Sequence, residues 1–146
     1  METAQIVKEL LSQMGFSDAE VMARVLAGRV KIDVKTAGGR DLIGERGVIL
    51  ACLQHIIRKI ITRKTGESVI LDVDVNNYKK MRENIMRDFA KEVRDKVRFS
   101  GKAVELAPMP SFDRRIIHLA LAEFPDVVTH SMDEGPKRYV VVRPYP

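Results

Sequence analysis

The sequence is short of residues that several classes of protein require. It has one cysteine, Cys52, which excludes an intrachain disulfide, and no tryptophan among aromatics that make up only 5% of the chain. Few aromatics disfavour a large stacking platform for single-stranded bases. No apolar run approaches the ~18 residues of a membrane-spanning helix, and charged residues interrupt the N-terminal apolar pattern in a way that a signal peptide does not tolerate. These absences predict a soluble, cytoplasmic protein without a membrane span.

Signatures of common enzymes and metal sites are absent as well. The chain contains no P-loop, no G-x-S-x-G and no H-E-x-x-H. Its three histidines, His55, His118 and His130, do not stand at zinc-ligand spacing, and Cys52 with His55 supplies two ligands at most. We therefore predict no catalytic residues, no metal and no cofactor, and do not expect an enzyme.

Charge, by contrast, is abundant and unevenly placed. The net charge is +5, with 45% apolar and 31% charged residues, as in soluble globular proteins. Residues 41–64 hold five Lys or Arg against two Asp or Glu, and residues 78–102 hold nine against four. Both segments have helical spacing of apolar residues. Two interpretations remain open: a phosphate-binding face on two helices, or ordinary surface lysines and arginines, which are good helix formers.

The first half of the chain alternates between helical and strand periodicity. Val30, Ile32 and Val34 alternate with charged residues, and the short connection Ala27-Gly28-Arg29 predicts a hairpin. The isoleucines between residues 49 and 61 recur at helical spacing and are expected in the core. The predicted elements are a helix over residues 4–14, strands over 21–26 and 30–36, a helix over 48–64 and a strand over 68–75. This order is α-β-β-α-β.

Two aspartates lie in the last of these strands. Asp72 and Asp74 alternate with valine and therefore share one strand face. We interpret this face as solvated, with a divalent-ion site as the alternative.

The second half begins at Asn76-Asn77, which are good N-cap residues. Ser111 is the expected cap of a second helix, and Asp133-Glu134-Gly135-Pro136 has the composition of a turn. The predicted elements are a helix over 78–99, a strand over 102–107, a helix over 111–123 and strands over 127–132 and 137–142. The buried ridge of the first helix is expected to be Tyr78, Met81, Ile85, Phe89, Val93 and Val97. The whole chain is thus predicted as α+β, with a first domain over 1–77 and a second, α-β-α-β-β, over 78–146.

The tetrapeptide Gly44-Glu45-Arg46-Gly47 opens the helix over 48–64. Paired glycines let a nucleic-acid backbone approach main-chain N–H groups at a helix N-terminus, where the helix dipole favours an anion. The tetrapeptide alone is more often a turn. Its position after a hairpin, before an isoleucine-rich basic helix and a β-branched strand, favours the GXXG loop of a KH domain.

With these elements in place, residues 1–77 resemble a KH domain of the type II arrangement. Residues 78–146 resemble an R-three-H domain, whose signature is an arginine and a histidine separated by three residues, here Arg114 and His118 within PMPSFDRRIIHLAL. The combination, with the basic linking helix and the terminal GPKRYVVV, resembles the bacterial Jag proteins. The extra N-terminal domain and linker of many Jag proteins are not in this sequence, which we therefore expect to be a short form.

The resemblance implies binding of single-stranded nucleic acid, RNA above all, without catalysis. It implies a post-transcriptional regulator, or a ribosome- or mRNA-associated factor, linked to cell-envelope or division processes. Arg114 and His118 lie one helical turn apart on one face, with Arg115 pointing elsewhere. The resemblance and the basic pattern together give the candidate nucleic-acid contacts Gly44, Glu45, Arg46, Gly47, Arg58, Lys59, Arg63, Lys64, Arg98, Lys102, Arg114, Arg115 and His118.

Simpler interpretations stay open for several of these residues. Arg114 and His118 are also explained if they only pair with Asp113 or Glu123. Lys79, Lys80 and Arg82, by contrast, stand near a helix N-terminus, where the dipole disfavours cations, which suggests another reason for their presence. Glu45 would repel phosphate. An alternative to RNA binding is therefore an interaction adaptor, in which the first domain pairs with a second KH-domain protein or a membrane-insertion partner.

Overall fold

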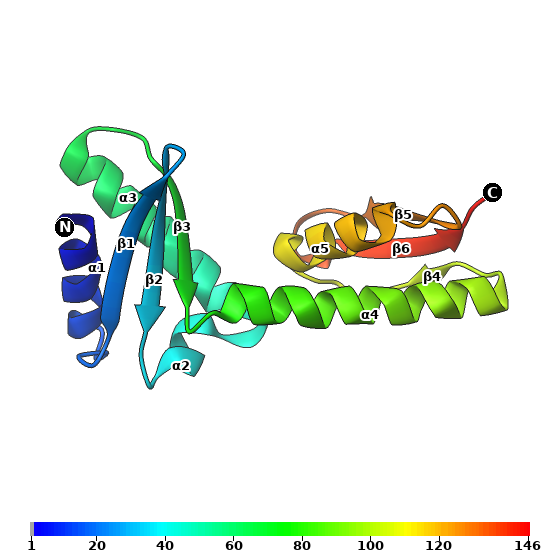
Figure 1. Cartoon of the computed structure of the whole chain (residues 1–146), viewed down its shortest axis with the longest axis horizontal. Helices are drawn as coiled ribbons and strands as arrows, with labels where there is room; N and C mark the ends of the chain where they lie inside the picture. The colour runs from blue at the N-terminus through cyan, green and yellow to red at the C-terminus, as the bar shows by residue number, and fades with distance from the viewer. Residues whose placement is uncertain (1) are drawn as a thin grey trace. The chain divides into compact units, whose positions relative to one another are not determined.

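The computed structural model of the chain describes residues 2–146. It divides into a first unit that runs through Lys79 and a second unit from Lys80 onward, each with its own sheet and core (Figure 1). Within the described residues, no helix combines the length and apolarity that crossing a membrane requires.

A three-stranded sheet and its helices make up the first unit. The elements are α1 (Glu2–Gln13), β1 (Glu20–Leu26), β2 (Arg29–Lys35), α2 (Gly39–Ile43), the 3₁₀ turn η1 (Glu45–Gly47), α3 (Val48–Thr65) and β3 (Ile70–Val75). The predicted order α-β-β-α-β lacks α2. Five residues are too few for an apolar period to be recognised, so the sequence pattern does not predict this helix.

The predicted hairpin is confirmed and forms one side of the sheet. β1 and β2 pair antiparallel with Leu26 opposite Arg29, and both turn residues, Ala27 and Gly28, have positive φ (51° and 76°), as a two-residue hairpin turn of type I′ requires. β3 adds to the other side of β2 in parallel, which gives the order β1-β2-β3. The inward-facing Ile32, Val34 and Val73 are at most 1% exposed.

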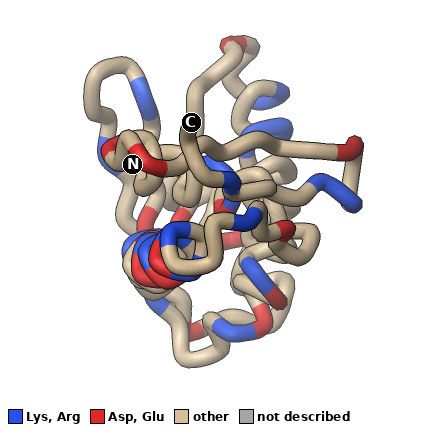
Figure 2. The backbone as a smooth tube through the Cα atoms, turned by 90° about the vertical axis from the view of Figure 1, so that its right-hand side faces the viewer, with Lys and Arg blue, Asp and Glu red and all other residues tan. Residues whose placement is uncertain are grey.

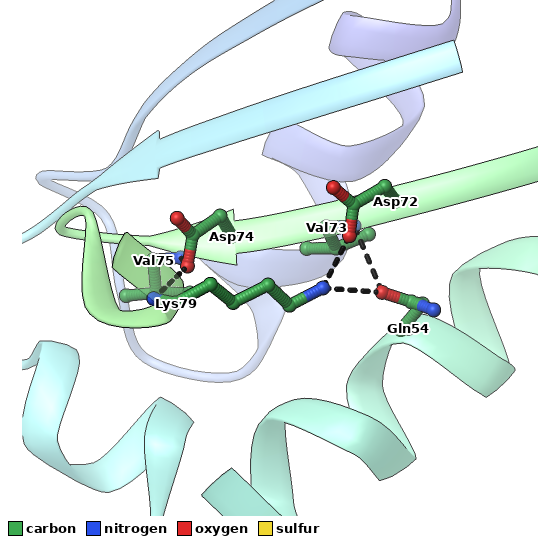
Figure 3. A network of polar contacts seen from close by, with 6 residues as sticks. All are labelled: Gln54, Asp72, Val73, Asp74, Val75 and Lys79. Atoms are coloured by element: carbon green, nitrogen blue, oxygen red, sulfur yellow. Dashed lines mark hydrogen bonds and ion pairs between the residues drawn. The ribbon is translucent and has the colours of Figure 1, made fainter. Parts of the chain in front are cut away.

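The link from β3 to the next helix, α4 (Tyr78–Ser100), corrects two sequence predictions (Figure 3). Asp74 is 7% exposed, and its Oδ1 accepts hydrogen bonds from the backbone N–H of Lys79 (3.1 Å) and of Val75 (3.0 Å). Asp74 therefore satisfies a donor in the first turn of α4. The prediction that its strand face is solvated is wrong for Asp74 and holds only for the half-exposed Asp72.

The asparagines do not have the capping role that their sequence position predicts. Asn76 and Asn77 have positive φ (51° and 57°) and form the turn itself. The side chain of Asn76 accepts from the N–H of Thr36 (3.1 Å) and donates to its carbonyl (2.9 Å). This amide ties the chain after β3 to the chain after β2, a partner forty residues away that local sequence could not indicate.

The second unit contains short antiparallel strands, the helix α4 and one further helix. Its elements after α4 are β4 (Val104–Glu105), α5 (Ser111–Ala122), β5 (Val127–Met132), the 3₁₀ turn η2 (Gly135–Lys137) and β6 (Tyr139–Pro144), with sheet order β4-β6-β5. The predicted first strand is therefore reduced to two residues. Ser111 is the first residue of α5 and not its cap, since Pro110 holds the N-cap position.

The buried face of α4 is rotated from the predicted one. Met86, Ala90, Val93 and Val97 are buried in the core of the second unit. Met81, Ile85 and Phe89, expected in that ridge, are 56%, 51% and 37% exposed. Both sets follow steps of three and four residues and share Val93 and Val97, so periodicity alone could not choose between them.

Candidate nucleic-acid interface

The loop Gly44–Gly47 has a backbone that only glycine readily adopts at two of its positions. Gly44 has φ 72° and ψ −175°, and Gly47 has φ 77° in the left-handed region; Arg46 between them also has positive φ (57°). A Cβ on Gly44 would lie 2.6 Å from the side chain of Ile49, and one on Gly47 would lie 3.0 Å from the ring of Tyr78. Packing within the first unit thus already accounts for both glycines.

The same loop leaves a helix N-terminus without a side-chain cap. Gly47 occupies the N-cap of α3, no side chain caps it, and the first turn of α3 holds no acidic residue. The absence of a side-chain cap and the positive end of the helix dipole suit an anion at this point, although the N–H of Val48 already donates to the carbonyl of Glu45. Glu45 and Arg46 are both exposed beside it, so the loop presents one charge of each sign.

α3 is only partly the core helix that its isoleucines predict. Leu50, Leu53, Ile57 and Ile61 are buried, but Ile49 and Ile56 are 46% and 49% exposed, which corrects the expectation that the whole isoleucine ladder is core. Toward the C-terminal end of α3, the exposed residues are mainly basic. The predicted contact residues Arg58, Lys59, Arg63 and Lys64 are all exposed.

The second candidate site forms where α5 faces β5. His118 on α5 bonds through Nδ1 to the hydroxyl of Thr129 (2.6 Å) and through Nε2 to the hydroxyl of Ser131 (2.8 Å). A hydroxyl can donate or accept, so both bonds persist in either neutral tautomer. β5 therefore fixes the plane of the imidazole ring.

Met109 brings Arg114 next to Arg138, a residue that the sequence analysis did not single out. The Nε of Arg114 donates to the carbonyl of Met109 (3.1 Å), and the N–H of Met109 donates to the carbonyl of Arg138 (3.1 Å). Arg138 stands between η2 and β6. Its Nε is buried without a hydrogen-bond partner among the described residues. A buried charged donor left unpaired is costly, and since Arg138 as a whole is only half-buried, its guanidinium is a candidate contact for a ligand.

The pKa values of Arg114 and His118 are both lowered in this group. Burial, followed by the charge of Arg138, lowers the pKa of the Arg114 guanidinium. Burial is again the first cause for His118, and the charges of Arg114, His130 and Arg138 lower the pKa of its imidazole further. An anion placed among these groups would act in the opposite direction on both.

Several cations of the predicted basic track on α4 are engaged in the fold. Arg98 pairs with Asp126 (2.8 Å), as does Arg94 (3.2 Å), whose guanidinium also covers the ring of Phe124 at 3.9 Å. Figure 2 shows acidic residues interspersed with the basic ones along α4. Lys102, after the end of the helix, is exposed.

Two of the three cations near the start of α4, Lys79 and Arg82, are likewise engaged in the fold, whereas Lys80 is exposed. Lys79 bonds to Asp72 and to Gln54. Arg82 binds the carboxylate of Asp113 through two nitrogens (3.1 and 2.8 Å), and Asp113 is fully buried. Asp113 is thus occupied by Arg82, not by Arg114 as the simpler interpretation of the motif supposed. Arg115 is exposed and does not join the group around His118.

Comparison with known proteins places the second half of the chain in a defined class. Residues 84–144 match the family model of the R-three-H domain. The chain is 35% identical over 101 residues to the RNA-binding protein KhpB of Clostridium symbiosum, covering 69% of this chain and 46% of that protein. It is 34% identical over 103 residues to the RNA-binding protein KhpB of Bacillus subtilis, covering 69% and 50%.

These matches define an α+β protein with an R-three-H domain. The chain belongs to the Jag-type family, whose curated relatives carry the name RNA-binding protein KhpB. A more distant relative of that name, from Streptococcus pneumoniae, is 25% identical over 113 residues. The chain spans about half the length of the first two relatives that it matches, 46% and 50%.

Proposed function

We propose that this protein binds single-stranded RNA, without catalysing a reaction, and that the group Arg114, His118 and Arg138 is its principal phosphate contact. The observation that carries the proposal is the buried, unpartnered Nε of Arg138, among the described residues, beside a second guanidinium and an oriented imidazole. Guanidinium groups bind phosphate oxygens through paired N–H donors. The names of the relatives support RNA as the ligand.

The first unit is proposed to act as a KH domain, over residues 1–77, that adds a second contact. Its uncapped α3 N-terminus, the glycine loop and the exposed cations that follow support a backbone contact there. The negative charge of Glu45 repels phosphate at this loop. We therefore propose that the first unit contributes less of the RNA affinity than the second. A cytoplasmic role in post-transcriptional regulation, as the family resemblance implies, is part of the same proposal.

The test is fluorescence anisotropy with a labelled, unstructured RNA and the full chain. Arg114→Ala with His118→Ala, and separately Arg138→Met, should each weaken binding by about tenfold or more, since each removes a charge-assisted phosphate contact. Arg87→Ala is the matched control, because it removes an arginine of α4 that forms an exposed ion pair with Glu83, one turn away on the same helix. Equal affinities for all four proteins would refute the assignment of this site.

The loop has its own pair of variants. Arg46→Asp should weaken binding, and Glu45→Gln should strengthen it, because the first inverts a charge at the helix N-terminus and the second removes the opposing one. If neither changes the affinity, the first unit does not contact RNA through this loop.

A second candidate function follows from the exposed apolar side chains of α3. Val48, Ile49 and Ile56 are 53%, 46% and 49% exposed, a surface that a protein partner, such as another KH-domain protein, could cover. An adaptor of this kind should form a protein complex that survives moderate salt, whereas RNA binding should weaken steeply with salt. Pull-down at two salt concentrations with Ile56→Asp against wild type distinguishes them.

A further inference from the structure

The two edges of the sheet in the first unit differ. β1 and β3 are the outer strands, with β2 between them (Figure 1). Along β3, the N–H of Val73 donates to the Oε1 of Gln54 (3.0 Å), and the N–H of Val75 donates to the Oδ1 of Asp74 (3.0 Å) (Figure 3). These side chains bind donors that a further strand would need, so the edge of β3 is closed to pairing.

The pairing of the hairpin determines which backbone groups of β1 point away from β2. Leu26 and Arg29 flank the two-residue turn and therefore form a hydrogen-bonded pair. Hydrogen-bonded and non-bonded pairs alternate along an antiparallel ladder. The N–H of Asn76 donates to the carbonyl of Val34, the residue opposite Val21, so this carbonyl points away from β1, as the alternation requires. The residues of β1 that direct their N–H and C=O outward are Val21, Ala23 and Val25.

The edge of β1 lacks the features that protect a free edge. Among the described residues, no side chain bonds to these outward groups as Gln54 and Asp74 bond at β3. β1 has the sequence EVMARVL, without proline or lysine, and pairs with β2 in unbroken register, without a bulge. Its apolar side chains are exposed: 64% for Met22, 73% for Val25 and 56% for Leu26. A regular, apolar and open edge strand is a site for pairing with another strand.

The helix α1 packs on one face of β1. Val7 and Leu11 of α1 are buried, and Val21 and Ala23 pack half-buried against the same core. The side chains of a strand stand perpendicular to its hydrogen bonds within the sheet. Packing of α1 on these side chains therefore leaves the outward N–H and C=O groups of β1 without a strand partner.

β1 is complementary to a second copy of itself. When two β1 strands run antiparallel with Ala23 opposite its own copy, Val21 lies opposite Val25 of the other copy, so every outward group finds a partner. A shift by one residue opposes outward groups to inward ones, and a shift by two leaves an outward residue unmatched on each strand. In the centred register Glu20 lies diagonal to Arg24 of the other copy, which is an attractive pair.

We propose that two copies of this chain associate through β1, antiparallel and centred on Ala23, so that their sheets join into one continuous sheet. The backbone hydrogen bonds supply the attraction, and the match of outward residues sets the register. Burial of the exposed apolar side chains of β1 adds to the affinity. This interface uses neither the α3 surface of the adaptor function nor bound RNA.

The first test is the mass of the full-length, RNA-free protein, measured by light scattering after size-exclusion chromatography. Wild type should have twice the 16.5 kDa of the single chain. Ala23→Pro removes an outward N–H that β2 does not use, a change that an edge strand tolerates. It should weaken association by about tenfold or more, because the two symmetry-related hydrogen bonds are lost together.

A pair of lysine variants tests the same edge without changing the backbone. Val25→Lys places a charge on the pairing edge and should give the mass of a single chain. Ile70→Lys is the matched control, since Ile70 is similarly exposed (62%) but lies on β3. It should retain the dimer. Urea unfolding checks that each variant is folded.

A cysteine on the two-fold axis tests the register. The background is Cys52→Ser, which removes the one native thiol. Ala23→Cys should then form an intermolecular disulfide under mild oxidation, since opposite Cα atoms of a hydrogen-bonded pair are about 5.5 Å apart, within disulfide range. Lys31→Cys, on the central strand β2, should not.

A wild-type protein that keeps the mass of one chain at every soluble concentration would overturn the inference and leave the edge to an extended segment of a different protein. A dimer that survives Val25→Lys but is dissociated by Ile56→Asp would also overturn it, because association would then proceed through α3. A dimer that Ala23→Pro and Val25→Lys both weaken, and that Ala23→Cys crosslinks, supports the pairing of β1 with its copy.

Discussion

The glycine loop shows how one residue type can serve structure before it serves a ligand. Gly44 and Gly47 are required by their backbone angles and by close approach to Ile49 and Tyr78. A G-x-x-G match in a sequence therefore does not by itself indicate nucleic-acid binding. What supports binding here is the uncapped N-terminus of α3 that the loop leaves behind.

Gly44→Ala should lower the free energy of unfolding of the first unit by about 1–3 kcal/mol, because alanine must adopt a conformation nearly confined to glycine. Gly66→Ala is the matched control: Gly66 also has positive φ (75°) but has no neighbour within 4 Å of an added Cβ. It should lose only about 1–2 kcal/mol. Urea unfolding measures both, and equal losses would show that the contact with Ile49 carries no cost.

His118 should make stability depend on pH. Its folded-state pKa lies below the ordinary value of 6.5 through burial and the neighbouring cations, so the unfolded chain binds the proton more readily. Stability should therefore be highest above pH 6.5 and fall as the pH decreases through that value. His118→Gln should flatten this dependence in urea unfolding at about pH 7.5 and about pH 5.5, on either side of the ordinary value. An unchanged pH dependence in the variant would contradict the shift.

At the scale of elements, two helices of the second unit are joined by one buried ion pair. Asp113 in the first turn of α5 is fully buried and binds Arg82 of α4 through both carboxylate oxygens. A carboxylate in the first turn also suits the positive end of the helix dipole. The relative position of α4 and α5, and with it that of Arg114, depends on this pair.

Asp113→Ala should destabilise the second unit by about 3 kcal/mol, the lower end for breaking a buried pair, because the side chain of Arg82 keeps 23% of its exposure. Glu83→Ala, which breaks the exposed pair of α4 with Arg87, should cost only about 0.5 kcal/mol. Thermal unfolding of the two variants provides the comparison. Similar melting temperatures would argue against a structural role for the buried pair.

Element-level prediction succeeds where the signal is local and fails where it depends on a distant partner. The hairpin, α3 and α5 follow from alternation, glycine and helical spacing, and their positions agree with the structure within a few residues. The predicted ridge of α4 is wrong because its spacing fits two faces equally well. The cap at Asp74 is not predictable because the asparagines are equally good caps by type and stand closer to the helix, while Asn76 instead bonds to Thr36.

For the molecule as a whole, the net charge of +5 is modest, and some of its arginines are paired with aspartates within the fold. RNA affinity should therefore depend on a limited set of exposed cations. If about five phosphates are contacted, a fourfold rise in salt should weaken binding about a hundredfold. Anisotropy titrations across the salt range measure the slope. A slope near zero would favour the adaptor function over RNA binding.

The sequence by itself determined the α+β class, the order of nearly all elements, the glycine loop and the spacing that sets Arg114 and His118 on one face of a helix. These features arise from interactions between residues close together in the chain. Only the tertiary structure decided that Arg138 joins them through Met109, that Asp113 belongs to Arg82, and that Lys79 fixes Gln54 against β3. Each of these depends on which distant segments pack together, because a side chain's hydrogen-bond partners are set by the packed elements and not by its neighbours in sequence.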